Sequence, residues 1–252
     1  MRSGSTWSYN VCKIFGGRVA ENRKFNFHSD FAYDIDSLIQ KMSKKAARTK
    51  SNIFGVVKAH DVGMRTKKKI SEGKIKNIYT IRDPRDCFAS MEKFMPRFEG
   101  VEIDDRIREF QRWLILGDEF FGDDVSLIIR YEEMVENNIK QIRRIANFLE
   151  IKCTDKLILN ISNATSVAAS QEIIKQMIET GKGVEKFKVA GKEKRFHPES
   201  QLHENHLNGG TIGRWRTELT EENQQKIHTA FSPWLIKFGY VNQDATHHPN
   251  ID

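Results

Sequence analysis

The sequence predicts an α/β fold in which a central parallel sheet is flanked by helices. Three short apolar runs have the length of strands, at residues 52–60, 75–81 and 125–130. Apolar residues at helical spacing follow the second and third runs, at 84–94 and 139–149. Strands that alternate with helices are typical of parallel sheets, whose ligands bind at the carboxyl ends of the strands. Functional residues are therefore expected where these runs end.

Caps and periodicity predict the other elements. A basic amphipathic helix is expected to begin at Asp34 or Asp36, and Asp83 is expected to cap the helix that Pro84 opens. Further helices are predicted at 6–14, at 103–121, over most of the chain after 150 and at 221–231, where Pro233 interrupts the last one. The basic cluster 65–69 is expected on a solvated loop or helix face, residues 181–213 as a lid or surface loop, and 241–252 as a frayed tail.

The size allows one large domain or two small ones, and one domain over residues 1–252 is expected because no internal repeat or domain linker is recognised. Hydrophobic residues make up 38% of the chain, which excludes a disordered protein. The net charge of +7 favours anionic partners such as nucleotides, nucleic acid or acidic glycans. No apolar run reaches the length of a membrane span, and no signal peptide is recognised. Three widely spaced cysteines predict free thiols in a cytoplasmic protein.

The stretch Arg2-Ser3-Gly4-Ser5-Thr6-Trp7 combines a basic residue, a small turn and two hydroxyls. A glycine turn that opens a helix points backbone N–H groups outward, and the helix dipole adds positive potential there. The stretch can therefore bind a phosphate or sulfate group, although it lacks the Walker A pattern. An ordinary capped helix start explains the same residues equally well.

Several of these stretches, taken in order, resemble the sulfotransferase family that uses 3′-phosphoadenosine 5′-phosphosulfate (PAPS). Residues 2–7 resemble its 5′-phosphosulfate loop, and Lys58-Ala-His60 resembles its Lys-x-His segment. Arg82 and Ser90 keep the spacing of eight residues found in its 3′-phosphate motif. The segments that begin at Tyr131 and Gly210 resemble its Tyr-Glu-Asp-Met and Gly-x-x-Gly-x-Trp segments. The resemblance implies a P-loop-like three-layer fold.

The resemblance also implies a role for each matching residue. Arg2, Ser3, Gly4, Ser5 and Thr6 would hold the 5′-phosphosulfate, while Trp7 would stack on adenine, Tyr131 would contact that ring and Gly210 would lie beside the nucleotide. Arg82 and Ser90 would bind the 3′-phosphate. Arg2 and Lys58 would stabilise charge on the bridging oxygen, and His60 would remove the proton of a hydroxyl or amine acceptor. No metal is expected, because arginine and lysine neutralise the charge.

Each residue also has a plain structural interpretation. His60 can bond to backbone at a strand end, Trp7 and Trp215 can be core aromatics, and Tyr131 can anchor its helix. Arg85 and Asp86 are interpreted as a surface pair. The histidines after residue 196 lack metal-ligand spacing, so solvated loop positions are expected for His197, His203 and His206.

Two departures from the family pattern affect the expected activity. The family's loop follows a β-strand, whereas Met1 alone precedes it here, so either the natural chain begins earlier or the loop is poorly held. The family's Arg-Lys-Gly is replaced by Asn208-Gly209-Gly210, which removes two contacts to the 3′-phosphate. Arg214 or Arg216 is a candidate replacement, and weak PAPS affinity is expected.

Two other functions compete with sulfuryl transfer. An incomplete relative could bind PAPS or its product adenosine 3′,5′-bisphosphate (PAP) without catalysis. A nucleic-acid-binding protein is supported by the charge alone, since no recognised nucleic-acid motif is present. The expected partners are thus a nucleotide co-substrate and an acceptor. The sequence identifies neither the acceptor nor the oligomeric state.

Overall fold

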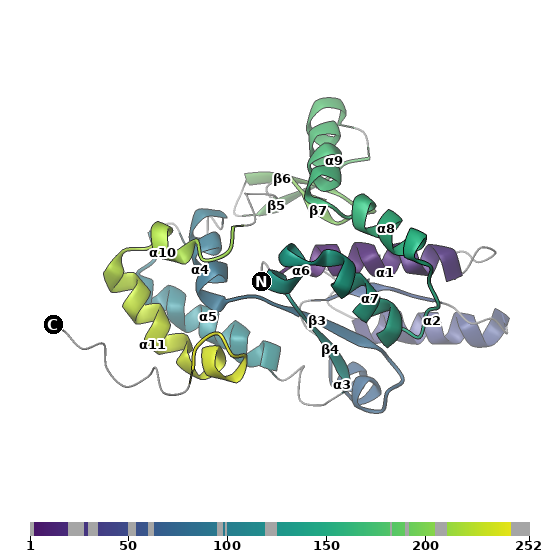
Figure 1. Cartoon of the computed structure of the whole chain (residues 1–252), viewed down its shortest axis with the longest axis horizontal. Helices are drawn as coiled ribbons and strands as arrows, with labels where there is room; N and C mark the ends of the chain where they lie inside the picture. Colours follow the sequence, from purple (N-terminus) through teal and green to yellow (C-terminus); the bar gives the residue numbers. More distant parts are fainter. Residues whose placement is uncertain are drawn as a thin grey trace. The chain divides into compact units, whose positions relative to one another are not determined.

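Parallel strands form two pairs in the computed structural model, and Figure 1 labels the longer pair. The structure describes residues 3–19, 28–29, 35–49, 54–59, 63–94, 98, 100–118, 125–181, 183–189, 192–204 and 211–242. Strand β1 (His28–Ser29) pairs in parallel with β2 (Val57–Lys58). Strand β3 (Asn77–Ile81) pairs in parallel with β4 (Ser126–Arg130), with Ile81 opposite Arg130. The α/β prediction is confirmed, and β1 is a strand that the sequence did not reveal.

The chain divides into two units, which we describe separately. The first comprises residues 1–3, 82–120 and 211–252, and the second comprises residues 4–81 and 121–210. The parallel strands belong to the second unit. The prediction of a single domain stays a prediction.

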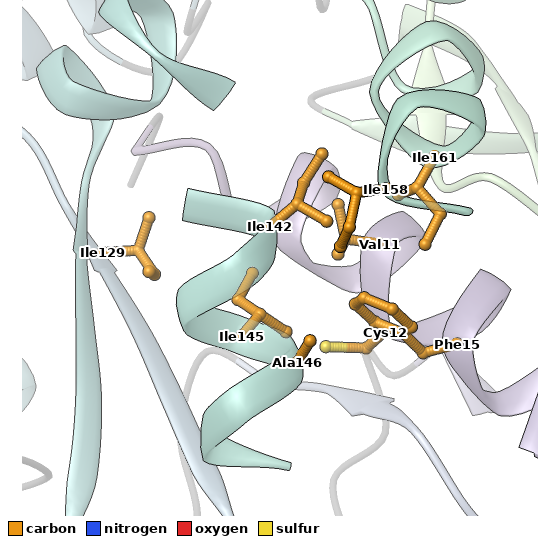
Figure 2. Close-up of a cluster of buried hydrophobic side chains, with 9 residues drawn as sticks. All are labelled: Val11, Cys12, Phe15, Ile129, Ile142, Ile145, Ala146, Ile158 and Ile161. Carbon is orange, nitrogen blue, oxygen red and sulfur yellow. The ribbon is translucent and has the colours of Figure 1, made fainter. Parts of the chain in front are cut away.

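The second unit is built on helix α1 (Ser5–Val19), which packs against both β2 and β3. Helix α7 (Asn138–Phe148) packs against α1, β4 and α8 (Asp155–Ala164). Figure 2 shows the shared core, to which these elements contribute Val11, Cys12, Phe15, Ile129, Ile142, Ile145, Ala146, Ile158 and Ile161. Residues three and four apart on each helix face this core, as the predicted periodicity requires. Burial raises the pKa of the Cys12 thiol to about 12, so this thiol is unreactive.

Side-chain caps fix where the helices of this unit begin. Asn137, Thr154 and Ser166 accept bonds from the backbone N–H three residues further on, at 3.0, 3.3 and 3.1 Å. The third of these opens α9 (Val167–Thr180), which ends at Gly181 in the left-handed conformation. The mostly helical structure predicted after residue 150 is thus correct up to residue 180.

An antiparallel sheet occupies part of the segment 181–213, which was expected as a lid or surface loop. It contains β5 (Glu185–Val189), β6 (Lys192–His197) and β7 (Leu202–His203). Strand β6 is dominated by charged residues, so the apolar alternation that predicts a strand is missing. A cross-strand ion pair between Lys186 and Glu193, at 3.0 Å, helps to stabilise the pairing of β5 with β6.

The first unit packs α4 (Pro84–Phe94) and α5 (Ile103–Asp118) against α11 (Glu221–Lys237). Its core contains Phe88, Phe110 and Phe231, with ring centroids 5.0–5.9 Å apart. The predicted break at Pro233 is wrong, since α11 continues to Lys237. Phe231, Trp234 and Leu235 are buried on both sides of the proline, and this packing compensates for the hydrogen bond that proline removes.

Four helices complete the description: α2 (Ile35–Thr49), α3 (Met64–Ser71), α6 (Tyr131–Glu136) and α10 (Trp215–Glu218). The first two confirm the basic amphipathic helix and show that the cluster 65–69 lies on a helix. In the described part of the chain, no helix has the length and apolar character needed to cross a membrane. The predicted tail is described only as far as residue 242.

Candidate functional site

The loop that opens α1 turns at Gly4. Its φ of +89° lies in the left-handed region that glycine adopts without strain. A Cβ atom here would lie 3.1 Å from Sδ of Met134 and 3.3 Å from Cδ2 of Tyr131. The loop therefore packs closely on α6, and the absence of a side chain at Gly4 permits this approach.

The first turn of α1 follows at once. The N–H of Ser8 donates to the carbonyl of Gly4 at 3.1 Å, and the Ser8 hydroxyl donates to the carbonyl of Ser5 at 3.0 Å. The N–H groups at the start of a helix have no partner within the helix, and they lie at the positive end of its dipole. The turn at residues 4–7 therefore has the backbone arrangement that binds anions.

Lys58, the last residue of β2, contacts this turn directly. Its Nζ donates to Oγ1 of Thr6 at 2.8 Å. Burial lowers the pKa of the Lys58 ammonium to about 8, because the charged form loses its hydration. A bound anion would favour the charged form, so this environment is suited to binding an anion.

Trp7 and Tyr131, the two residues expected to contact adenine, differ in their surroundings. Tyr131 begins α6 and lies against Gly4, and its contact with the nucleotide stays a prediction. Trp7 packs against the hydrophobic core of the second unit, which agrees with its interpretation as a core aromatic. Stacking of Trp7 on adenine stays a prediction.

Asn10 is a residue of this region that the sequence reasoning missed. Its Nδ2 donates to the carbonyl of Thr6 at 2.9 Å and to the carbonyl of Ser200 at 2.8 Å. One side chain thereby joins the first turn of α1 to the turn between β6 and β7. A polar residue within a helix was the only signal, and it does not identify a partner 190 positions away.

Arg82 lies in the first unit, where it is 5% exposed. Its Nη2 donates to Oδ2 of Asp86 at 3.3 Å and to the carbonyl of Thr211 at 2.9 Å. Asp86 is fully buried and also accepts from the N–H groups of Gly213, at 2.8 Å, and Trp215, at 3.2 Å. This carboxylate fixes both the predicted 3′-phosphate arginine and the turn that opens α10.

The interpretation of Arg85 and Asp86 as a surface pair is wrong. Arg85 is also buried, and its Nη2 pairs with Oδ2 of Asp83 at 2.7 Å. The Asp83 side chain accepts the N–H of Arg85 at 2.9 Å as well, which confirms the predicted helix cap. A run of charged residues next to a strand looks solvated, but here each charge has a buried partner of opposite sign.

The other face of the Arg85 guanidinium lies over the Trp215 ring, 4.3 Å from its centroid, and Arg216 lies 4.4 Å from the same ring. Nη1 of Arg85 lies 3.2 Å from Nδ1 of His228. Burial lowers the pKa of His228, the Arg85 charge lowers it further, and Asp83 partly opposes both. Trp215 is accordingly a buried aromatic, as its structural interpretation predicts.

The remaining predicted residues are accounted for as follows. Ser90 is buried on α4, in the same unit as Arg82. Ser3 is also buried, and Ser5 belongs to the first turn of α1. Arg214, a candidate replacement for the missing family contacts, donates to Glu218 at 2.8 Å. Arg2, His60, His206 and Gly210 lie outside the described residues. Within the described ranges, no group of three or more His, Cys, Asp or Glu side chains is arranged to hold a metal ion.

The parallel strands and the glycine turn at the start of α1 define an α/β protein with an anion-binding type of loop. A family model of the sulfotransferase domain matches residues 1–239. The chain belongs to the sulfotransferase family, as its motifs predicted. A comparison with curated protein sequences gave no match.

Solved structures of sulfotransferases share the fold. Mouse sulfotransferase SULT7A1, in complex with PAP, is 18% identical, with a TM-score of 0.59 over 97% of this chain and 83% of that chain. Retinol dehydratase, in complex with androsterone and the inactive cofactor PAP, is 15% identical, with a TM-score of 0.56 over 93% of this chain and 78% of that chain. The predicted fold class is thereby confirmed a second time.

Proposed function

We propose that this chain transfers the sulfuryl group of PAPS to a hydroxyl or amine of an acceptor by in-line displacement. Membership of the sulfotransferase family establishes the enzyme class. The nucleotide is PAPS, in agreement with the PAP bound to both related structures. PAPS supplies the sulfuryl group, and PAP is the leaving group. The protein residues bind the nucleotide, stabilise charge and move one proton.

The hydrogen bond from Lys58 to Thr6 is the observation that carries this proposal. It joins the end of a parallel strand to the turn that opens α1, which are the two places where such a fold binds anions. The buried ammonium has a neutral hydroxyl as this partner, so it can stabilise the negative charge that grows as the bond between sulfur and the phosphate oxygen breaks. Arg2 is proposed to stabilise the negative charge on the same phosphate oxygen.

The other end of the nucleotide is proposed to bind Arg82 and Ser90. Asp86 holds the Arg82 guanidinium through Nη2, which fixes the orientation of the side chain before a phosphate arrives. The same carboxylate offsets part of the arginine's positive charge, which supports the expectation of modest affinity for PAPS.

His60 is proposed as the general base that accepts the acceptor's proton. It stands two residues after Lys58 in the sequence, just beyond the end of β2. An imidazole is suited to this role, because its ordinary pKa lies close to neutrality.

The test measures transfer of radiolabelled sulfate from PAPS to a pool of phenols, alcohols, amines and glycans. His60→Ala should reduce transfer by about 10²–10⁴-fold while PAP binding by calorimetry stays within a few-fold of wild type. His247→Ala, outside every motif, is the matched control. Undiminished transfer by His60→Ala would remove this residue from the mechanism.

Thr6→Val and Thr6→Ser test the observation itself. Valine removes the hydroxyl that Lys58 contacts, whereas serine keeps it. Transfer should fall in the first variant and persist in the second. Binding of PAP without transfer to any acceptor would instead support a non-catalytic nucleotide-binding relative.

A cytoplasmic location is also retained as a proposal. It is supported by Cys12, Cys87 and Cys153, the three cysteines of the sequence, which are all free thiols in the structure. Free thiols are typical of a reducing compartment.

A further inference from the structure

The positive charge of this protein is concentrated in one segment. Residues 35–76 contain twelve of the 41 Lys and Arg residues but three of the 34 Asp and Glu residues, which gives a formal charge of +9. The rest of the chain therefore has a formal charge of −2, because the whole chain has +7. The excess positive charge of the protein thus belongs to a single region of the second unit.

Helices α2 and α3 present part of this charge to solvent. On α2 the exposed basic residues recur at helical spacing, so they share one face of the helix. The same spacing recurs on α3, which packs against α2. We define the basic surface as Lys41, Lys44, Lys45, Arg48, Arg65 and Lys68.

The basic surface includes an ion pair with an acidic residue. Glu72, at the end of α3, lies 3.8 Å from Lys68 and 2.7 Å from Lys74. Its pKa is lowered, first by the hydrogen bond from Lys74 and also by the charges of Lys68 and Lys69. One carboxylate is thus surrounded by cations, and the six residues of the basic surface carry six positive charges.

The chemistry of the surface favours an anionic bilayer over a nucleic acid. Residues 35–49 and 63–76 contain no Phe, Tyr or Trp on which a base could stack. Lysine, a point charge without the bidentate geometry of arginine, predominates. Met64 is 79% exposed and stands beside Arg65, where its apolar side chain can enter the boundary between headgroups and acyl chains.

We propose that the α2–α3 face docks this enzyme on membranes that contain anionic lipids. Clusters of four to eight Lys and Arg residues on an amphipathic helix are typical of such docking. The surface binds headgroups through charge and inserts Met64, while the nucleotide loop on α1 takes no part. The proposal therefore stands independently of the catalytic mechanism.

The experiment is co-sedimentation of the full chain with phosphatidylcholine vesicles that contain either no phosphatidylserine or about 30% phosphatidylserine. Binding is expected with the anionic vesicles alone, and it should weaken as salt is raised. Each basic residue near an anionic bilayer contributes about fivefold to partitioning. The variant K41Q/K44Q/R48Q/R65Q should accordingly partition at least about a hundredfold more weakly.

A matched variant separates the surface from net charge. K140Q/K152Q/K156Q/K175Q removes four exposed lysines of α7, α8, α9 and the α7–α8 connection. Its net charge equals that of the first quadruple variant. It should bind anionic vesicles within about threefold of wild type. Equal losses in the two variants would overturn the proposal, as would sedimentation with pure phosphatidylcholine. PAP affinity in both variants reports that the fold is intact.

Two further measurements test the kind of partner. Met64→Gln should weaken vesicle binding several-fold and leave binding to a polyuridine RNA or to heparin unchanged. A lack of effect of Met64→Gln on vesicle binding would contradict insertion. RNA or heparin binding that is tighter than vesicle binding, and lost in the first quadruple variant, would assign the surface to a soluble polyanion and reject the membrane proposal.

Discussion

The ammonium of Lys58 donates to the hydroxyl of Thr6 over 2.8 Å, and burial holds the pKa of this lysine near 8. A lysine in this state weakens the fold when it is charged. The charge is nevertheless placed against the turn where an anion is proposed to bind. Stability and binding are therefore expected to respond to this residue in opposite directions.

Lys58→Met should stabilise the protein at pH 7 by about 1–3 kcal/mol, from the size of the pKa shift. Below pH 8 the lysine is charged in both folded and unfolded chains, so wild type bears the full cost of burying it. Between pH 8 and 10.5 the unfolded chain binds more protons than the folded one, so wild-type stability rises with pH. Urea denaturation across this range should show the gap closing.

The control for this experiment is Lys152→Met, at an exposed position, which should change stability by less than about 0.5 kcal/mol. A difference between Lys58→Met and wild type that does not shrink between pH 8 and 10.5 would contradict a charged, buried Lys58.

PAP binding should take up protons above pH 8. The bound anion raises the pKa of Lys58, so the complex holds a proton that the free protein has lost. The logarithm of the association constant should then fall with pH, with a slope that approaches about −1. Calorimetry in two buffers of different ionisation enthalpy measures this uptake. A pH-independent affinity, equal in wild type and Lys58→Met, would show that the ammonium does not face the nucleotide.

Asp86→Asn should destabilise the first unit by about 3 kcal/mol. The substitution keeps the shape of the side chain but leaves the buried Arg82 without its carboxylate. One of the N–H groups of Gly213 and Trp215 also loses its acceptor, because an amide has a single oxygen. Asp105→Asn is the control, since Asp105 forms an exposed pair with Arg108 that should contribute less than about 0.5 kcal/mol. Equal free energies of unfolding for the two variants in chemical denaturation would argue against this role of Asp86.

Gly4→Ala should weaken PAP binding by about tenfold or more and destabilise the protein by about 1–2 kcal/mol. The added Cβ is strained by the positive φ and meets Met134 and Tyr131. Gly17→Ala, within α1 and with no atom near the new Cβ, should instead stabilise by about 0.5–1 kcal/mol. Calorimetry and thermal denaturation test both, and tight PAP binding by Gly4→Ala would exclude Gly4 from the site.

The sequence predicted the parallel strands β3 and β4 because their β-branched residues form continuous apolar runs. It missed β6, since a strand rich in Lys, Arg and Glu has no apolar alternation. It missed the continuation of α11 through Pro233, because local preference was overruled by the buried Phe231 and Trp234.

The site residues were predicted from the spacing of the motifs. Spacing located Lys58 and Arg82, but it could not reveal what each contacts. The i, i+4 relation of Arg82 and Asp86 was visible, yet burial alone distinguishes a structural ion pair from a solvated one.

The link that Asn10 makes between Thr6 and Ser200 has a consequence for biosynthesis. Ser200 is translated 190 residues after Asn10. The first turn of α1 therefore gains this contact only after residue 200 has been made. A nascent chain halted before residue 200 contains the whole loop but lacks the contact that holds its first turn against the β6–β7 turn.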